Sequence, residues 1–173
     1  MQTIATLVAQ FAKAGKVEWI GVRPARKQPL VSLPRAKINL NGIEGDHRNK
    51  PGKRTVTLIQ AEHLSVIASL CADETSPIDP ARLRRNIVVS GISLMGLRNR
   101  EFRIGNALLK GAGLCAPCSR MEIELGHGGY NAMRGHGGIC AEVLEEGEIE
   151  LQQSVCSVNT CLLYTSPSPR DRG

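Results

Sequence analysis

The sequence predicts a mainly β fold, a barrel or sandwich of short strands with one or two helices. Short runs rich in Val, Ile and Thr recur along the chain, and Gly and Pro residues separate them. Few segments place their apolar residues at helical spacing. Aromatic residues make up only 3% of the 173 residues, so the core must consist mainly of Ile, Leu and Val.

Residues 1–16 are expected to form an N-terminal amphipathic helix. Ile4, Leu7, Val8 and Phe11 recur every three or four positions, which is the spacing of one helix face. The segment has neither a charged start nor an uninterrupted apolar stretch, so it does not resemble a signal peptide. We therefore expect a cytoplasmic protein.

The next segments are predicted as strands joined by loops. Residues 17–23 alternate between apolar and other side chains, and residues 31–40 are extended but interrupted by Pro34, as at a sheet edge or a bulge. A loop rich in Gly and charge spans residues 42–53. Residues 54–60, which are compact and β-branched, form the clearest predicted strand.

The middle of the chain contains the second predicted helix. Residues 61–71 have apolar positions at helical spacing, and residues 72–81 contain two prolines and are expected to be a loop. Short strands are predicted at residues 86–90, 101–104 and 106–110, the last two around a glycine.

The last part of the domain is again predicted to be mainly β. Residues 121–125 alternate and predict a strand, whereas residues 126–138 are so rich in Gly that we expect a loop. Residues 139–144 and 148–151 predict a hairpin. The sequence thus predicts one main domain over residues 17–159.

Residues 160–173 are expected to be a foreign tail. Residues 161–171 resemble a translated transposon-type sequencing adapter read in frame. A foreign segment of this kind is not expected to contribute to the fold of the domain. This interpretation implies that the domain is truncated at its C-terminus.

The composition favours a small anionic ligand. The chain carries 22 Lys and Arg residues against 16 Asp and Glu residues, a net charge of +6. The scarcity of aromatic residues and the lack of a known binding motif argue against nucleic acid. No apolar run approaches the ~20 residues that span a membrane, so no membrane association is expected.

Cys115 and Cys118 have the C-x-x-C spacing, which several interpretations fit. They could form a redox dithiol, although this usually requires a helix after the first cysteine. They could form half of a zinc site with His127, His136 or Cys140. Cys118 could instead act as a single reactive or metal-binding thiol beside an arginine, or both could be inert. Two cysteines are expected to be structural: Cys71 and Cys140.

A second candidate region is the Gly-Ile-Glu-Gly-Asp-His segment at residues 42–47. Its glycines allow the backbone to approach a ligand closely. Asp46 and His47 could orient that ligand or move a proton. The segment could equally be a tight turn in which an acidic side chain accepts bonds from backbone amides.

Arg84, Arg85 and Asn86 stand directly before a predicted strand. Arginine binds phosphates and carboxylates with two parallel hydrogen bonds, and Asn offers both a donor and an acceptor. They could form an anion-binding wall, or the arginines could be a surface pair. The Gly-rich residues 126–138 could add backbone amides to such a site, with His127 and His136 as loop residues without a role.

Short motifs recur in a fixed order along the chain, at residues 42–47, 54–60 with Glu62, 84–89 before Gly91, 102–105, 116–118, 135–138 and 147–149. In this ordered set the chain resembles the MOSC family, found at the C-terminal end of molybdenum-cofactor sulfurases and as small bacterial proteins. The family usually closes with a Gly-Asp pair, whereas residues 150–155 lack one.

The resemblance implies a MOSC-like, pyruvate-kinase-type β-barrel with a few short helices. It implies that Cys118 is the family's characteristic cysteine, which carries sulfur as a persulfide or binds the molybdenum of molybdopterin. Arg84, Arg85 and Asn86 would then bind the phosphate or pterin of the cofactor, with Asp46 and His47 on the other flank.

Two functions follow as hypotheses. The first is a molybdenum-cofactor-binding or sulfur-carrying protein, acting as a sulfur transferase or a molybdenum-dependent oxidoreductase. Pyridoxal phosphate is not expected in this chain, so a cysteine desulfurase or a redox protein would be a separate partner. The alternative is a non-enzymatic β-barrel module that holds zinc or a phosphate-bearing ligand through Cys115, Cys118 and the Gly-rich loop.

Overall fold

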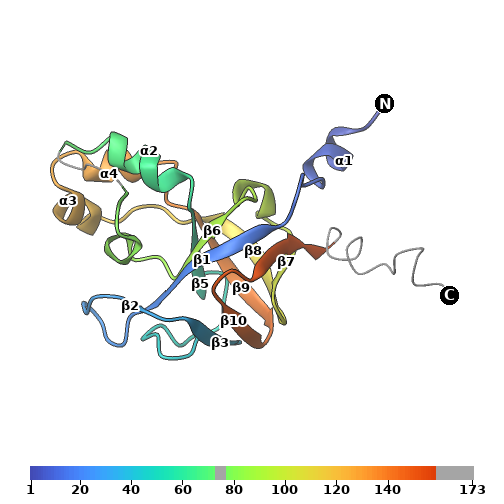
Figure 1. Ribbon diagram of the computed structural model, residues 1–173, viewed down its shortest axis with the longest axis horizontal. Coiled ribbons are helices and arrows are strands. Elements are labelled where there is room, and N and C mark those ends of the chain that lie inside the picture. The colour runs from blue at the N-terminus through green and yellow to red at the C-terminus, as the bar shows by residue number, and fades with distance from the viewer. Residues whose placement is uncertain (73–76, 159–173) are drawn as a thin grey trace.

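The computed structural model describes residues 1–72 and 77–158. The predicted foreign tail, residues 160–173, lies outside the described residues. Figure 1 shows strands at the centre of the molecule, with helices α2 (His63–Ser69), α3 (Arg120–Leu125) and α4 (Gly129–Met133) grouped on one side of them and helix α1 (Ile4–Val8) apart from that group. None of the described helices is long and apolar enough to cross a membrane.

Short strands dominate the described residues, as the sequence predicts. The strands are β1 Gly15–Val22, β2 Val31–Ser32, β3 Arg35–Asn39, β4 Gly42–Ile43, β5 Val56–Gln60, β6 Ile87–Ser90, β7 Glu101–Ile104, β8 Ala107–Leu114, β9 Ile139–Glu145, β10 Gly147–Glu150 and β11 Ser154–Ser157. The helices are α1 Ile4–Val8, α2 His63–Ser69, α3 Arg120–Leu125 and α4 Gly129–Met133, with 3-10 turns at Pro80–Leu83 and Met95–Leu97.

The main sheet closes on itself. Its strand order is β11-β7-β8-β9-β5-β6-β1-β2, and an additional pairing of β11 with β1 completes a barrel of seven strands within the described residues. A small second sheet has the order β10-β3-β4. Strands β5 and β6 pair in parallel, so the chain must cross over between them, and α2 lies in that crossover. The predicted mainly β barrel with a few short helices is confirmed.

The described residues form two hydrophobic clusters, one on each face of β5 and β6. Leu58 and Ile87 belong to the cluster inside the barrel, whereas Ile59 and Val88 pack against the helices. Successive side chains of a strand point to opposite faces, so these two strands are buried on both sides. This explains why β6 is an almost continuous apolar run.

The predicted strand at residues 121–125 is wrong: this segment is helix α3. The alternation of Met121, Ile123 and Leu125 suggested one buried strand face. Instead, Met121 and Leu125 are buried four residues apart on one helix face, while Ile123 is 80% exposed. Met, Glu and Leu also favour helix over strand.

The Gly-rich segment 126–138, predicted as a loop, contains helix α4. The Glu122 carboxylate accepts hydrogen bonds from the backbone N–H groups of Gly128 (2.7 Å) and Tyr130 (2.9 Å), which stabilise the start of this helix. Gly129 is required because a Cβ there would clash with α3 at Leu125.

Two further predictions change at the ends of the domain. The N-terminal helix spans only Ile4–Val8, and its apolar side chains are exposed, so no core contact extends it to residue 16. Residues 139–151 do not form a paired hairpin: β9 pairs with β5 and β8, whereas β10 pairs with β3.

Candidate functional site

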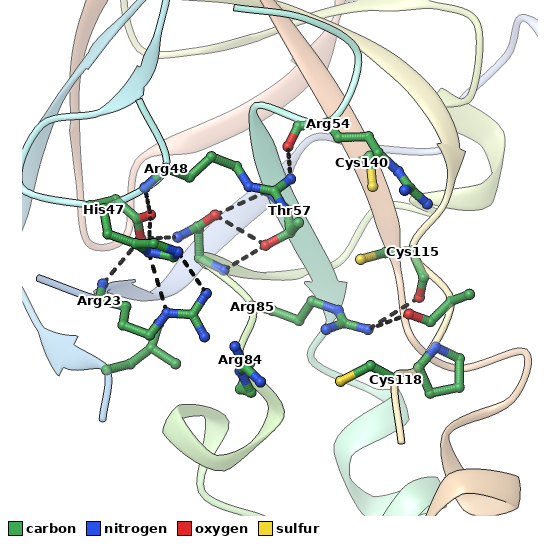
Figure 2. Close-up of a pocket in the computed structure, with 15 residues that line it drawn as sticks. Arg23, His47, Arg48, Arg54, Thr57, Arg84, Arg85, Cys115, Cys118 and Cys140 are labelled. Atoms are coloured by element: carbon green, nitrogen blue, oxygen red, sulfur yellow. Dashed lines mark hydrogen bonds and ion pairs between the residues drawn. The ribbon is translucent and has the colours of Figure 1, made fainter. Parts of the chain in front are cut away.

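A cavity of about 510 Å³, which we call the central pocket, forms where several loops meet (Figure 2). Its lining comes from the loop after β4, the turn before β6, the loop between β8 and α3, and the start of β9. The pocket brings together all six residues that the sequence predicts for the site: Asp46, His47, Arg84, Arg85, Asn86 and Cys118. Their roles remain predictions.

Asp46 and Asn86 form the structural centre of one side of the pocket. The Asp46 carboxylate accepts hydrogen bonds from the Asn86 side-chain amide (3.0 Å) and from the backbone N–H groups of Arg23 (3.0 Å) and Arg48 (2.9 Å). Asn86 Oδ1 accepts from the backbone N–H (3.2 Å) and the hydroxyl (3.0 Å) of Thr57. These side chains are therefore occupied in holding three segments together.

His47 lies beside Arg23 on the same side. Arg23 Nε donates to His47 Nδ1 at 3.3 Å, and the distance from Arg23 Nη2 to His47 Nε2 is also 3.3 Å. The remaining nitrogen, Arg23 Nη1, is buried and has no partner among the described residues. Arg23 is thus a site residue that the sequence reasoning missed, although its place at the end of the first predicted strand was a usable signal.

Arg84 and Arg85 are neighbours with different surroundings. Arg85 is only 6% exposed, and its guanidinium donates to the carbonyls of Gly137 (2.8 Å), Leu83 (3.0 Å) and Cys115 (3.1 Å). The Arg84 guanidinium makes no hydrogen bond or ion pair to the described residues, and Figure 2 shows it between the His47 side and the Cys118 side. Arg84 is therefore the arginine available to a ligand.

Arg84 also has an unusual backbone conformation. Its φ of 60° and ψ of 35° lie in the left-handed region, where it ends the 3-10 turn Pro80–Leu83. Non-glycine residues in this region carry strain, which tends to occur at functional sites. Figure 2 shows that the Arg84 and Arg85 side chains leave the backbone in different directions.

Cys118 is exposed on the loop between β8 and α3. The loop is held by its backbone: Arg85 binds the Cys115 carbonyl, and the Cys115 N–H donates to the Gly138 carbonyl at 2.9 Å. Gly137 is required here because a Cβ would clash with the Cys115 carbonyl oxygen. The Cys118 side chain is left at the pocket rim.

Comparison with known proteins identifies the family. The sequence model of the MOSC domain matches residues 43–156. The chain belongs to the MOSC family. A search of the curated proteins found no match.

Solved structures agree with this MOSC fold. The YUAD protein from Bacillus subtilis has a TM-score of 0.73 at 18% identity, over 84% of this chain and 96% of that one. YiiM from Geobacillus stearothermophilus has a TM-score of 0.67 at 16% identity, over 83% and 75%. YiiM from Escherichia coli has a TM-score of 0.66 at 16% identity, over 92% and 82%. At these identities the likeness concerns the fold alone.

Cys140 is a further residue of the MOSC domain's pocket. It was expected to be structural, yet it lines the central pocket together with Cys115 and Arg54. A hydrogen bond from the Cys115 thiol, aided by the Arg54 guanidinium, lowers the pKa of Cys140 against the opposing effect of burial. The same hydrogen bond and burial raise the pKa of Cys115. Cys71, in contrast, is buried against α2.

The histidines of the MOSC domain's Gly-rich segment lie away from the pocket. The His127 side chain is fully exposed beside Glu122, and His136 packs edge-on against His63, with ring centroids 5.3 Å apart. Among residues 1–72 and 77–158, no cluster of three His, Cys, Asp or Glu side chains is arranged to hold a metal ion. His127 and His136 therefore do not join Cys115 and Cys118 in the lining of the central pocket.

Proposed function

We propose that this MOSC protein binds the molybdenum cofactor in the central pocket, with Cys118 as the thiol that faces the molybdenum. One observation carries the proposal: the exposed thiol of Cys118 shares one cavity with the Arg84 guanidinium, which has no partner among the described residues. The cavity of about 510 Å³ falls within the usual range of small-molecule sites, roughly 300–1,000 Å³.

The donors of the pocket suit the anionic part of this cofactor. Arg84 offers a free guanidinium, and the buried Arg23 Nη1 lacks a hydrogen-bond acceptor among the described residues. Such a buried donor favours a ligand that supplies an oxygen atom. A second cavity of about 340 Å³ shares Arg23, Leu30 and Arg84 with the first, which leaves room for a longer ligand.

Each residue then has a distinct task. Arg84 and Arg23 bind the phosphate, and His47, which contacts Arg23, orients that guanidinium. Asp46 and Asn86 hold these groups in place. When bound, the cofactor supplies oxygen- or sulfur-atom transfer coupled to a two-electron change at molybdenum. Cys118 supplies a soft thiolate ligand, which suits such a metal.

The proposal is tested by metal analysis of protein made in a host that produces the cofactor. We expect molybdenum to copurify with the wild type and with Cys71→Ala, and to be lost in Cys118→Ser. Arg84→Ala should lower cofactor content, whereas Lys110→Ala, which removes an exposed charge outside the pocket, should not. Full molybdenum content in Cys118→Ser would overturn the assignment.

Sulfur carriage on Cys118 is the second candidate. Its support is the exposure of Cys118 at the pocket rim, where a separate desulfurase could deliver sulfur. The thiol would then carry one added sulfur atom as a persulfide. The intact mass of the protein, measured before and after treatment with a reducing agent, tests this, because reduction removes the added sulfur of a persulfide. The Cys118→Ser variant should not carry the added mass at this position.

A further inference from the structure

Two thiols other than that of Cys118 meet inside the central pocket. Cys115 follows β8 and Cys140 lies in β9, and Figure 2 shows both side chains in the same part of the pocket. The pairing of these strands places Leu114 opposite Ile139, and the Cys115 N–H donates to the Gly138 carbonyl at 2.9 Å. Figure 2 shows the Cys115 and Cys140 side chains directed into the same space, and the interaction of the two thiols shifts their pKa values in opposite directions.

The surroundings of this pair are cationic. Arg54 and Arg85 line the same pocket, and the positive charge of each acts to lower the pKa of both cysteines. A positive neighbour stabilises the thiolate, which is the nucleophilic form of cysteine. Inert structural cysteines, in contrast, lie in apolar surroundings. Cys140 is only 3% exposed, so the pocket is its route to other molecules.

We propose that Cys140 and Cys115 form a dithiol couple that reduces the sulfur–sulfur bond of a small disulfide or persulfide in the central pocket. The inference goes beyond the proposed function because it does not involve the Cys118 thiol. It assigns Cys140 as the attacking thiol and Cys115 as the resolving thiol. The product on the protein is a Cys115–Cys140 disulfide.

The chemistry balances without a further oxidant or reductant. The Cys140 thiolate attacks one sulfur of a small disulfide, a mixed disulfide forms, and the other half leaves as a thiolate that takes up a proton. The Cys115 thiol then loses its proton and attacks the Cys140 sulfur, which releases the second half as a thiol. Two electrons and two protons pass from the protein dithiol to the substrate. A persulfide would yield one thiol and hydrogen sulfide.

The Cys118→Ser variant tests this couple separately from the proposed function. The reduced variant is incubated with bis(2-hydroxyethyl) disulfide, a small neutral probe, and then alkylated. Proteolytic cleavage after Lys, Arg and Glu yields a peptide of residues 111–120, whose one cysteine is Cys115, and a peptide of residues 135–142, whose one cysteine is Cys140. We expect these two peptides to be joined by a disulfide, with two equivalents of 2-mercaptoethanol released. Absence of the joined peptide would overturn the proposal.

Single-thiol variants test the order of attack in the same background. Cys115→Ser should trap the mixed disulfide on Cys140, because the resolving thiol is absent. Cys140→Ser should react at Cys115 more slowly, by about tenfold or more, since the thiolate favoured by Arg54 is lost. Equal rates at the two positions would contradict the assignment of Cys140 as the attacking thiol. Retention of the thermal unfolding midpoint confirms that each variant is folded.

Discussion

The two sides of the central pocket are held in place by different means. On the hydrogen-bonded wall, which we define as Asp46, Thr57 and Asn86, the side chains bind one another. On the thiol wall, Cys115, Cys118 and Cys140, the Cys115 loop is held through its backbone, by Arg85 and Gly138. The first wall uses its side chains for structure, whereas the second leaves them available for chemistry.

This difference predicts different results from mutation. A substitution in the hydrogen-bonded wall leaves buried polar groups without partners and should destabilise the protein. A conservative change of a thiol leaves the backbone bonds intact, so stability should change little while reactivity is lost. Cysteine variants are therefore suitable for functional assays, and variants of the other wall must be compared at matched stability.

Removal of the Asn86 side chain should have the largest effect. Asn86→Ala removes one hydrogen bond from the Asp46 carboxylate and one from the Gly21 carbonyl, and it removes the acceptor of the Thr57 N–H and hydroxyl. We expect the free energy of unfolding in urea to fall by about 3 kcal/mol. The exposed Asn49→Ala should remain within about 0.5 kcal/mol of the wild type. If Asn86→Ala lowered the free energy of unfolding by less than about 1 kcal/mol, the hydrogen-bonded wall would not have the structural role that distinguishes it from the thiol wall.

The neighbouring arginines provide a matched pair with a smaller effect. Arg85→Lys keeps the charge but cannot bind the carbonyls of Leu83, Cys115 and Gly137 together, so we expect a loss of about 2 kcal/mol in unfolding free energy. Arg84→Lys, which breaks no bond within the described protein, should change stability by less than about 0.5 kcal/mol. Similar losses in both variants would contradict the roles given to them.

A change of Arg84 to glycine should separate stability from binding. Glycine adopts a φ of 60° without strain, so Arg84→Gly should raise the free energy of unfolding by about 0.5 kcal/mol. The same variant should bind inorganic phosphate about tenfold more weakly in calorimetry. Gln152→Gly, also at positive φ, should share the stability gain without the loss of binding. Unchanged phosphate affinity in Arg84→Gly would remove Arg84 from the site.

The smallest effect should come from Glu122, which connects α3 and α4 near the thiol wall. Hydrogen bonds from Tyr130 and Gly128 lower the pKa of Glu122 below its ordinary value of 4.5. The folded state therefore favours the charged carboxylate, and its contribution to stability is present at neutral pH and disappears as the pH falls through the folded pKa.

Stability measured against pH checks this sign. Glu122→Gln should be less stable than the wild type at pH 7, and the difference should decrease below about pH 4.5. The exposed Asn49→Ala, which removes no ionisable group, should show no such pH-dependent difference. A difference that grows as the pH falls would contradict the hydrogen bonds assigned to Glu122.

Much of the site could be predicted because its motifs have local chemical signals. Asp46 and His47 stand among glycines, Arg84 and Arg85 precede a strand, and Cys118 lies in a Gly- and Pro-punctuated loop. The fold brings all of these together. Cys140 could not be assigned in this way, because it lies inside an apolar strand and enters the pocket only through the pairing of β9 with β8.

Helices α3 and α4 were also harder to predict, because their formation depends on a contact between two segments. The alternation of Met121, Ile123 and Leu125 fits a strand, and the spacing of the first and last fits a helix equally well. Packing against α4 decides between them, and that contact depends on Gly129. From the sequence alone, the Gly-rich residues 126–138 predict a loop, because their close contact with α3 is not visible in the sequence.

The buried Arg23 Nη1 should affect both the rate of ligand association and the enthalpy of binding. This nitrogen has already left solvent in the free protein, and His47 already fixes the guanidinium that carries it. A ligand oxygen that reaches it therefore gains a hydrogen bond with little loss of side-chain freedom. Association should accordingly release heat and require no slow rearrangement of this side of the pocket.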